Sequence, residues 1–165
     1  MTAIELLDAL AEFITEKVKD YRYIMSDGSA KTPKVYAGCL PARLDNHTEF
    51  SPFIVVKLVM VNDESTEATA DVKIVFTVHD EDAIDNWRSE LSIVEHVRQS
   101  LLKTRTIGNK FRKQDEQSYT VADYAPIPEG YGHISVSYSI GQPIEEDLVN
   151  YDYTTDEANI CRAKH

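Results

Sequence analysis

The sequence contains little cysteine and no long uncharged apolar run, and each scarcity excludes a class of protein. Only Cys39 and Cys161 occur among 165 residues, and two cysteines in a cytosolic chain are more often plain thiols than a disulfide or a metal site. The longest apolar run, Phe53 to Val61, already contains Lys57 and is far shorter than the roughly 20 residues that a membrane span needs. We therefore expect no membrane association and no disulfide framework.

Basic residues are also few in comparison with acidic ones. The chain has 17 basic and 28 acidic residues, with a formal net charge of −11, which disfavours binding to phosphate backbones and favours solubility. A dedicated DNA-binding protein is therefore not expected, although an acidic surface can line a passage through which DNA slides. The segment that opens the chain lacks the basic region and small-residue cleavage site of a secretory signal. We expect the chain to remain in the cytoplasm where it is made.

Motifs for catalysis, metals and nucleotides are missing as well. The histidines are scattered without HExxH or CxxC spacing, and the pair Cys161 and His165 lacks the two further ligands of a closed zinc site. Neither GxSxG nor GxxxxGK occurs, and the weak glycine pattern Gly130-Tyr-Gly132 leads into an expected strand instead of a helix. The acids from Asp80 to Asp85 suit the start of a helix better than a calcium loop. We expect no enzyme, no cofactor and no metal.

Hydrophobic periodicity predicts an α+β fold. Apolar residues at helical spacing predict one helix from Thr2 to about Tyr23, capped by Thr2 and Glu5, and a second that starts near Ile84 and ends near Gly108. Alternation and β-branched residues predict the strands, and a short extended piece bounded by prolines precedes them. The predicted strands and extended piece are Val35 to Pro41, Phe53 to Val61, Val72 to Val78, Ser118 to Ala122 and His133 to Ile140.

These elements are best buried by an antiparallel or mixed sheet of about four strands, with both main helices packed on one face. The last strand alternates apolar residues with Ser135, Ser137 and Ser139, which predicts that one of its faces is wet. The polar segment Asn62 to Ala70 is expected to be a flexible hairpin loop with an exposed tip. We predict a single domain over residues 1–144, followed by an acidic arm over residues 145–165.

Opposite charges are segregated along the chain. From Arg98 to Lys113 there are six basic residues and no acid, whereas six acids crowd the stretch from Glu145 to Glu157. Such charge runs usually form solvent-exposed surface. The alternative is that a basic loop on one copy meets an acidic surface on a neighbour and sets the register of self-assembly. The arm from Leu148 to Tyr153 is a further candidate contact, because tyrosine suits interfaces, although docking on its own sheet is equally compatible.

Several stretches resemble the tail-terminator and tail-completion proteins of long-tailed phages and prophages. They are Val35-Tyr-Ala-Gly-Cys-Leu-Pro41, Ser51-Pro-Phe-Ile-Val-Val-Lys57, the acidic loop and strand up to Val78, and the helix from Trp87 to Leu102. The likeness spans roughly Val35 to Ile140 and is one of pattern, without an invariant catalytic motif.

The resemblance implies a non-enzymatic structural subunit of the virion tail, assembled in the bacterial host cytoplasm. Such a subunit forms a ring, typically a hexamer, that caps the tail tube and provides the joint to the head connector. Its partners would be copies of itself, the tail tube protein and the head-connector protein, with DNA only as passing cargo. Another neck or head-tail joining component is the first alternative, and a small-molecule binder on an α+β sheet is the second.

The expected site is an interface, because the family has no catalytic residues to transfer. Its candidates fall into a basic stretch, an acidic loop and a tyrosine arm. They are Lys103, Arg105, Lys110, Arg112 and Lys113; Asp63, Glu64 and Glu67; and Tyr151 and Tyr153.

Overall fold

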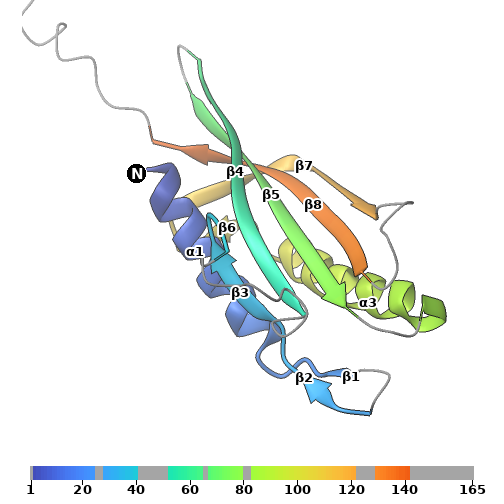
Figure 1. Ribbon diagram of the computed structural model, residues 1–165. Helices are drawn as coiled ribbons and strands as arrows, with labels where there is room; N and C mark the ends of the chain where they lie inside the picture. Colours follow the sequence, from blue (N-terminus) through green and yellow to red (C-terminus); the bar gives the residue numbers. More distant parts are fainter. Residues whose placement is uncertain are drawn as a thin grey trace, which may run out of the picture.

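The structure is a computed structural model that describes residues 2–24, 28–40, 52–64, 67–79, 83–121 and 129–141. These residues form two helices, a two-stranded sheet and a six-stranded sheet (Figure 1). The elements, in chain order, are α1 (Ala3–Val18), β1 (Tyr23–Ile24), β2 (Ala30–Lys31), β3 (Lys34–Ala37), β4 (Phe53–Asp63), β5 (Ala68–His79), α3 (Ala83–Lys103), β6 (Thr106–Ile107), β7 (Phe111–Val121) and β8 (Glu129–Ile140).

Helix α1 begins at the predicted cap. The Thr2 side chain accepts a hydrogen bond from the Glu5 backbone N–H at 3.3 Å, and the Glu5 carboxylate accepts one from the Thr2 backbone N–H at 3.2 Å. This reciprocal pair satisfies two backbone donors that a helix start otherwise leaves free. The helix ends at Val18, earlier than the predicted end near Tyr23, because Tyr23 already belongs to β1.

The main sheet has the strand order β3-β4-β5-β8-β7-β6. Strand β3 pairs with β4 in parallel, and all other pairs are antiparallel. The prediction of a mixed sheet is confirmed, but the prediction of about four strands was too low. The two short outer strands β3 and β6 account for the difference. Strand β3 overlaps the predicted extended piece Val35 to Pro41, which was not counted among the four strands, whereas β6 spans only two residues, too few to show periodicity.

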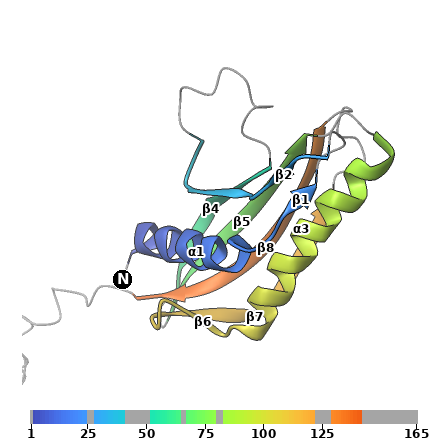
Figure 2. The same ribbon diagram turned by 90° about the horizontal axis from the view of Figure 1, so that it is seen from below.

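Both helices cover the same face of this sheet, as predicted (Figure 2). One continuous core joins Leu10 of α1 and Val97 of α3 to Ile74 of β5 and Ile134 of β8, all of them fully buried. Burial of such side chains stabilises the fold by roughly 1.5 to 3 kcal/mol each. The shared core confirms the α+β class and the arrangement of two main helices on one face.

The opposite face of the sheet is only partly covered. A small cluster of Phe53, Val55 and Val75 packs there with Tyr36 and Leu40, at the end of the sheet where β3 pairs with β4. Along β8 this face presents half-buried serines, which alternate with the buried core residues Ile134, Val136 and Tyr138. The predicted wet face of the last strand is therefore confirmed, and its serines are Ser135, Ser137 and Ser139.

Helix α3 approaches β8 closely at Gly132. A Cβ atom at Gly132 would lie 2.6 Å from Oε1 of Glu90 and 3.4 Å from Cγ2 of Val94, so a side chain at this position would push against the helix. Glu90 is 3% exposed, and its Oε1 has no hydrogen-bond partner among the described residues. Gly132, which had the weak appearance of a phosphate-loop glycine, therefore serves the packing of a helix on a strand.

Candidate functional site

The second half of β4 is an exposed strand with an open outer edge. Strand β3 pairs only with Phe53 to Val56 of β4, and in the described part of the chain no strand pairs with the outer edge from Lys57 onward. This half of β4 and its partner β5 project past the end of β3 (Figure 1). An unpaired edge offers free backbone donors and acceptors to another chain.

Four consecutive apolar side chains of this half-strand are exposed to solvent. The exposed fractions are 40% for Leu58, 60% for Val59, 50% for Met60 and 37% for Val61. The ladder with β5 shifts register between Leu58 and Met60, which leaves Val59 without an opposite residue, as in a β-bulge. Single exposed apolar residues are ordinary, but a contiguous run on an open edge marks an interaction surface.

The bulge spreads the apolar run over both faces of the sheet. Leu58 lies opposite Val72, whose side chain belongs to the core beneath the helices, whereas Met60 lies opposite Asp71, which is hydrogen-bonded on the other face. Because directly paired residues share a face, the exposed edge has apolar groups on each side. A partner that added to this edge would bury both.

The acidic loop candidates lie at the end of this hairpin. Asp63 ends β4, Glu67 precedes β5, and the Glu64 backbone N–H donates to the Glu67 carbonyl at 2.9 Å. The predicted loop Asn62 to Ala70 was too long, because both strands extend into it and leave a much shorter connection. The Glu67 carboxylate accepts hydrogen bonds from Gln114 at 3.0 Å and from Ser139, which ties the acidic end to the neighbouring strands.

The basic candidates surround the turn between β6 and β7. Lys103 ends α3, Lys110 lies in the turn, and Arg112 lies in β7; all three are exposed. The turn contains Gly108 and Asn109, both with φ of 57°, a left-handed conformation that these two residue types tolerate best. Helix α3 ends at Lys103, before the predicted end near Gly108. Strand β7 begins at Phe111, whereas the sequence predicted a strand only from Ser118, because Arg112 to Gln117 is polar throughout.

Two of the basic side chains have partners within the chain. Lys113 Nζ donates to the Leu101 carbonyl at 2.7 Å and so caps the end of α3, where cations are favoured. Burial lowers the pKa of this ammonium, and the nearby charge of Arg105 lowers it further. Arg105 forms an exposed ion pair with Asp115 at 3.5 Å. Lys113 is therefore a structural residue, whereas the side chains of Lys110 and Arg112 are exposed and have no partner among the residues that the structure describes.

The acidic and basic candidates lie at the same end of the sheet but on opposite edges. One ladder row runs from Asn62 through Thr69 and Ser139 to Arg112. Three strand spacings separate its two ends, about 14 Å along a flat ladder. Within one copy the sheet therefore places Asp63 and Arg112 on opposite edges, while Glu67 reaches Gln114 of β7. Tyr151 and Tyr153 lie outside the described residues, so the tyrosine arm stays a prediction.

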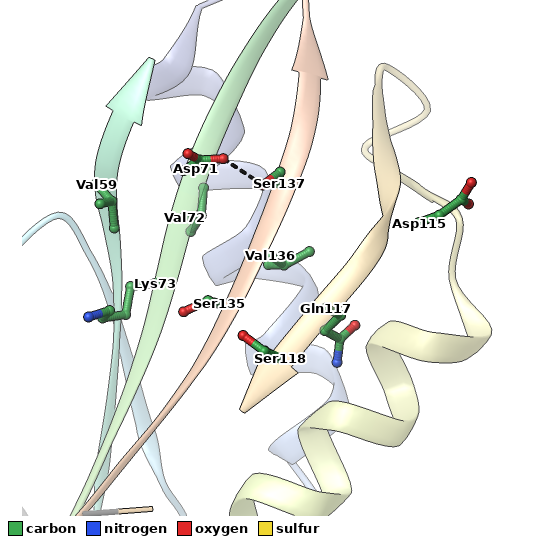
Figure 3. Close-up of a pocket in the computed structure, with 10 residues that line it drawn as sticks. All are labelled: Val59, Asp71, Val72, Lys73, Asp115, Gln117, Ser118, Ser135, Val136 and Ser137. Carbon is green, nitrogen blue, oxygen red and sulfur yellow. Dashed lines mark hydrogen bonds between the residues drawn. The ribbon is translucent and has the colours of Figure 1, made fainter. Parts of the chain in front are cut away.

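A hollow of about 700 Å³ lies over β5, β8 and β7, and Figure 3 shows the side chains that line it. Ser137 donates a hydrogen bond to Asp71 at 2.5 Å across two of these strands. At the nearby His133, burial lowers the pKa and the charge of Lys73 lowers it further, which favours the neutral imidazole. The lining residues are Val59, Asp71, Val72, Lys73, Asp115, Gln117, Ser118, Ser135, Val136 and Ser137.

Among the described residues, no group of three or more histidine, cysteine or acidic side chains converges in a way that could hold a metal ion. None of the helices described is long and apolar enough to cross a membrane.

The sequence does not reveal that the apolar run is exposed. Its pattern predicts one uniform strand from Phe53 to Val61, and the β-branched composition does not indicate that only the first half is covered. A weak signal was present. Lys57 interrupts the run where the cover ends, and an edge lysine commonly marks such a boundary.

No family model matches the sequence, and no curated protein matches it. Among solved structures, a chain described as part of the virion of a native gene transfer agent particle is 14% identical, with a TM-score of 0.36. The match covers 84% of this chain and 96% of that chain.

Proposed function

We propose that this protein is a non-enzymatic structural subunit of a phage-like tail, a tail terminator that assembles into a ring on the end of the tail tube. In that role it provides the joint to the head connector, and DNA passes through the ring. The observation that carries the proposal is the exposed apolar run of β4 on an open sheet edge, a surface that favours association with another protein chain.

Two further features support an assembly role. Charges of opposite sign occupy opposite edges of one sheet, which suits a repeated head-to-tail contact. The sequence also resembles tail-terminator proteins from Val35 to Ile140, a span that includes both edges. The net charge of −11 suits a channel that does not retain DNA.

The test is the mass of the full-length protein by light scattering over a range of concentrations, with negative-stain imaging of the same samples. We expect rings of fixed size, either in free solution or after purified tail tubes are added. A protein that remains monomeric at every concentration and leaves tube ends bare would contradict the proposal. Attachment at the head side instead would favour another neck component.

A small-molecule binder is the second candidate, and the hollow over β5, β8 and β7 is the observation that favours it. Its serine hydroxyls, Lys73 and the Asp71 carboxylate offer polar groups to a ligand. Binding to the folded state raises the melting temperature. This alternative would be supported if a ligand raised the melting temperature of the wild type but not of the Lys73→Ala variant, and if the protein formed no ring.

A further inference from the structure

We propose that the ring is built by joining the open edge of β4 in one copy to the outer edge of β6 and β7 in the next. This inference rests on the proposed function and specifies the contact through which copies associate. It assigns the partner of the exposed apolar run as a second copy of this chain, bound in a head-to-tail manner.

The first argument is that the opposite edge of the sheet is also open. Strand β6 pairs with β7 only at Phe111 and Arg112, and the Lys113 backbone N–H donates to Arg105 at 2.9 Å. From Gln114 onward, no other strand in the described ranges pairs with the outer edge of β7. Each copy therefore has two different unpaired edges, and a contact between different edges generates rings or filaments.

The second argument is strand direction. Three successive antiparallel pairings lead from β4 through β5 and β8 to β7, so β4 and β7 run in opposite directions. In a ring whose rotation axis runs along the strands, every copy has its strands in the same orientation along that axis. Strand β4 of one copy is therefore antiparallel to β7 of the next copy, as it is to β7 of its own. Antiparallel pairing needs no crossover and outnumbers parallel pairing in proteins.

The third argument is charge at matching heights. A closed ring relates its copies by rotation without translation along the axis, so residues of one ladder row meet at one level. Asn62 and Arg112 share such a row. The contact therefore places Asp63 and Glu64 of one copy beside Lys110 and Arg112 of the next. Opposite charges at these positions set register and speed encounter.

The fourth argument concerns the apolar surface that the contact would bury. Leu58 and Val61 face the helix side of β4, and Tyr119, which is 46% exposed, lies on the same side of β7 opposite Ile134. Arg98 stacks over the Tyr119 ring at 5.6 Å, which holds the ring beside the edge. In the same-level register Leu58 shares a ladder row with Gln117, so Leu58 of one copy would lie diagonally from Tyr119 of the next, within reach of an aromatic side chain. Val61 would lie level with Lys113.

The experiment uses two charge-reversal variants of the full chain. The tip variant has Asp63→Lys and Glu64→Lys, and the turn variant has Lys110→Glu and Arg112→Glu. Each variant places like charges across the contact when it meets itself, so we expect the concentration for half-assembly to rise more than about tenfold. An equimolar mixture pairs opposite charges at every contact and should recover rings in which the two variants alternate.

Matched controls change the net charge by the same amount away from both edges. Glu16→Lys with Asp20→Lys is the control for the tip variant, and Lys17→Glu with Lys19→Glu is the control for the turn variant. All four positions are exposed at the end of α1, and Figure 1 shows this end far from the β4–β5 hairpin tip. The controls should assemble as the wild type does, and melting temperatures should show that all variants fold.

The outcomes separate the inference from the proposed function. If the wild type forms rings and the two variants form them equally well, the edge contact is wrong and the ring proposal stands. If the variants fail alone and also fail as a mixture, the two edges do not meet each other. If the full-length variant Tyr151→Ser with Tyr153→Ser abolishes assembly and the edge variants do not, the C-terminal arm is the occupant. A wild type that forms no ring on its own or on tubes contradicts both proposals.

Discussion

The two halves of β4 have similar compositions and opposite environments. Phe53 to Val56 is buried on both faces and paired on both edges, whereas Leu58 to Val61 is exposed and, among the described strands, paired on one edge only. Both stretches are rich in β-branched residues. The difference shows that strand propensity determines the conformation of this segment, and that the neighbouring elements determine what its side chains contact.

The elements that pack on β4 explain why only its first half is buried. Helix α1 and strand β3 both contact β4, and β3 reaches only as far as Val56. The small cluster of Phe53, Val55 and Val75 closes the opposite face at this end of the sheet. Past Val56 these covers stop while the strand continues to Asp63. Among the described residues no strand or helix covers this half, and the proposed contact between copies would bury its apolar side chains.

The largest expected effect comes from truncating matched residues in the two halves. Ile54→Ala removes a side chain that is 1% exposed and should lower the free energy of unfolding by about 3 to 5 kcal/mol, because it leaves a cavity. Leu58→Ala removes a side chain that is 40% exposed and should cost less than about 1 kcal/mol. Urea denaturation at a concentration where the protein is monomeric measures both. Equal losses would mean that the halves do not differ in the free protein.

The next largest effect is expected at Glu90, a carboxyl buried between helix α3 and the sheet. Burial raises the pKa of Glu90 to about 7, and a hydrogen bond from the Tyr131 backbone opposes the shift. The native state therefore retains a proton that the unfolded chain loses above its ordinary pKa of about 4.5. The contribution of the Glu90 carboxyl to the free energy of unfolding is therefore complete below pH 4.5 and is lost as the pH rises through about 7. The loss amounts to at most about 3 kcal/mol.

Glu90→Gln should remove this pH dependence, because an amide does not titrate. We expect the variant to be less sensitive than the wild type between pH 4.5 and 8 and to be the more stable of the two at pH 8. Denaturant midpoints over that range provide the measurement. A wild type whose stability did not fall with rising pH in this window would show that the carboxyl is not buried as described.

A smaller effect is expected at the close contact between α3 and β8. Gly132→Ala places a Cβ atom 2.6 Å from Glu90 Oε1 and should cost about 1 to 2 kcal/mol through overpacking. In a Glu90→Ala background the same substitution should cost less, because the obstructing side chain is absent. The four-variant cycle measures the coupling, and additive costs would contradict the contact.

The smallest effect on stability is expected in the uncovered half. Val59→Thr keeps the β-branched shape and adds a hydroxyl at an exposed position, so the free energy of unfolding should change by less than about 0.5 kcal/mol. The same substitution should weaken ring formation, because the added hydroxyl must be desolvated in the contact between copies. Thermal melting and light scattering of the same preparation separate the two effects. A large loss of stability with unchanged assembly would mean that Val59 supports the fold of one copy and not the contact between copies.

Much of the fold and part of the candidate site could be predicted from the sequence. The capped helix, the long central strands and the wet face of β8 follow from periodicity and capping residues. The charged groups also stood out as blocks of one sign. The second half of β7 was predicted as the strand that begins at Ser118, but its first half could not be foreseen, because Arg112 to Gln117 is polar and lacks alternation.

The sequence by itself determined which segments form helices and strands and which side of each is apolar, because those properties depend on residues close together in the chain. Only the tertiary structure decided which apolar residues are covered. It placed Leu58 to Val61 beyond the end of β3 and set Asp63 and Lys110 on opposite edges of one sheet. These facts depend on pairings between strands far apart in sequence, and the local pattern of a single strand contains no record of where its neighbours end.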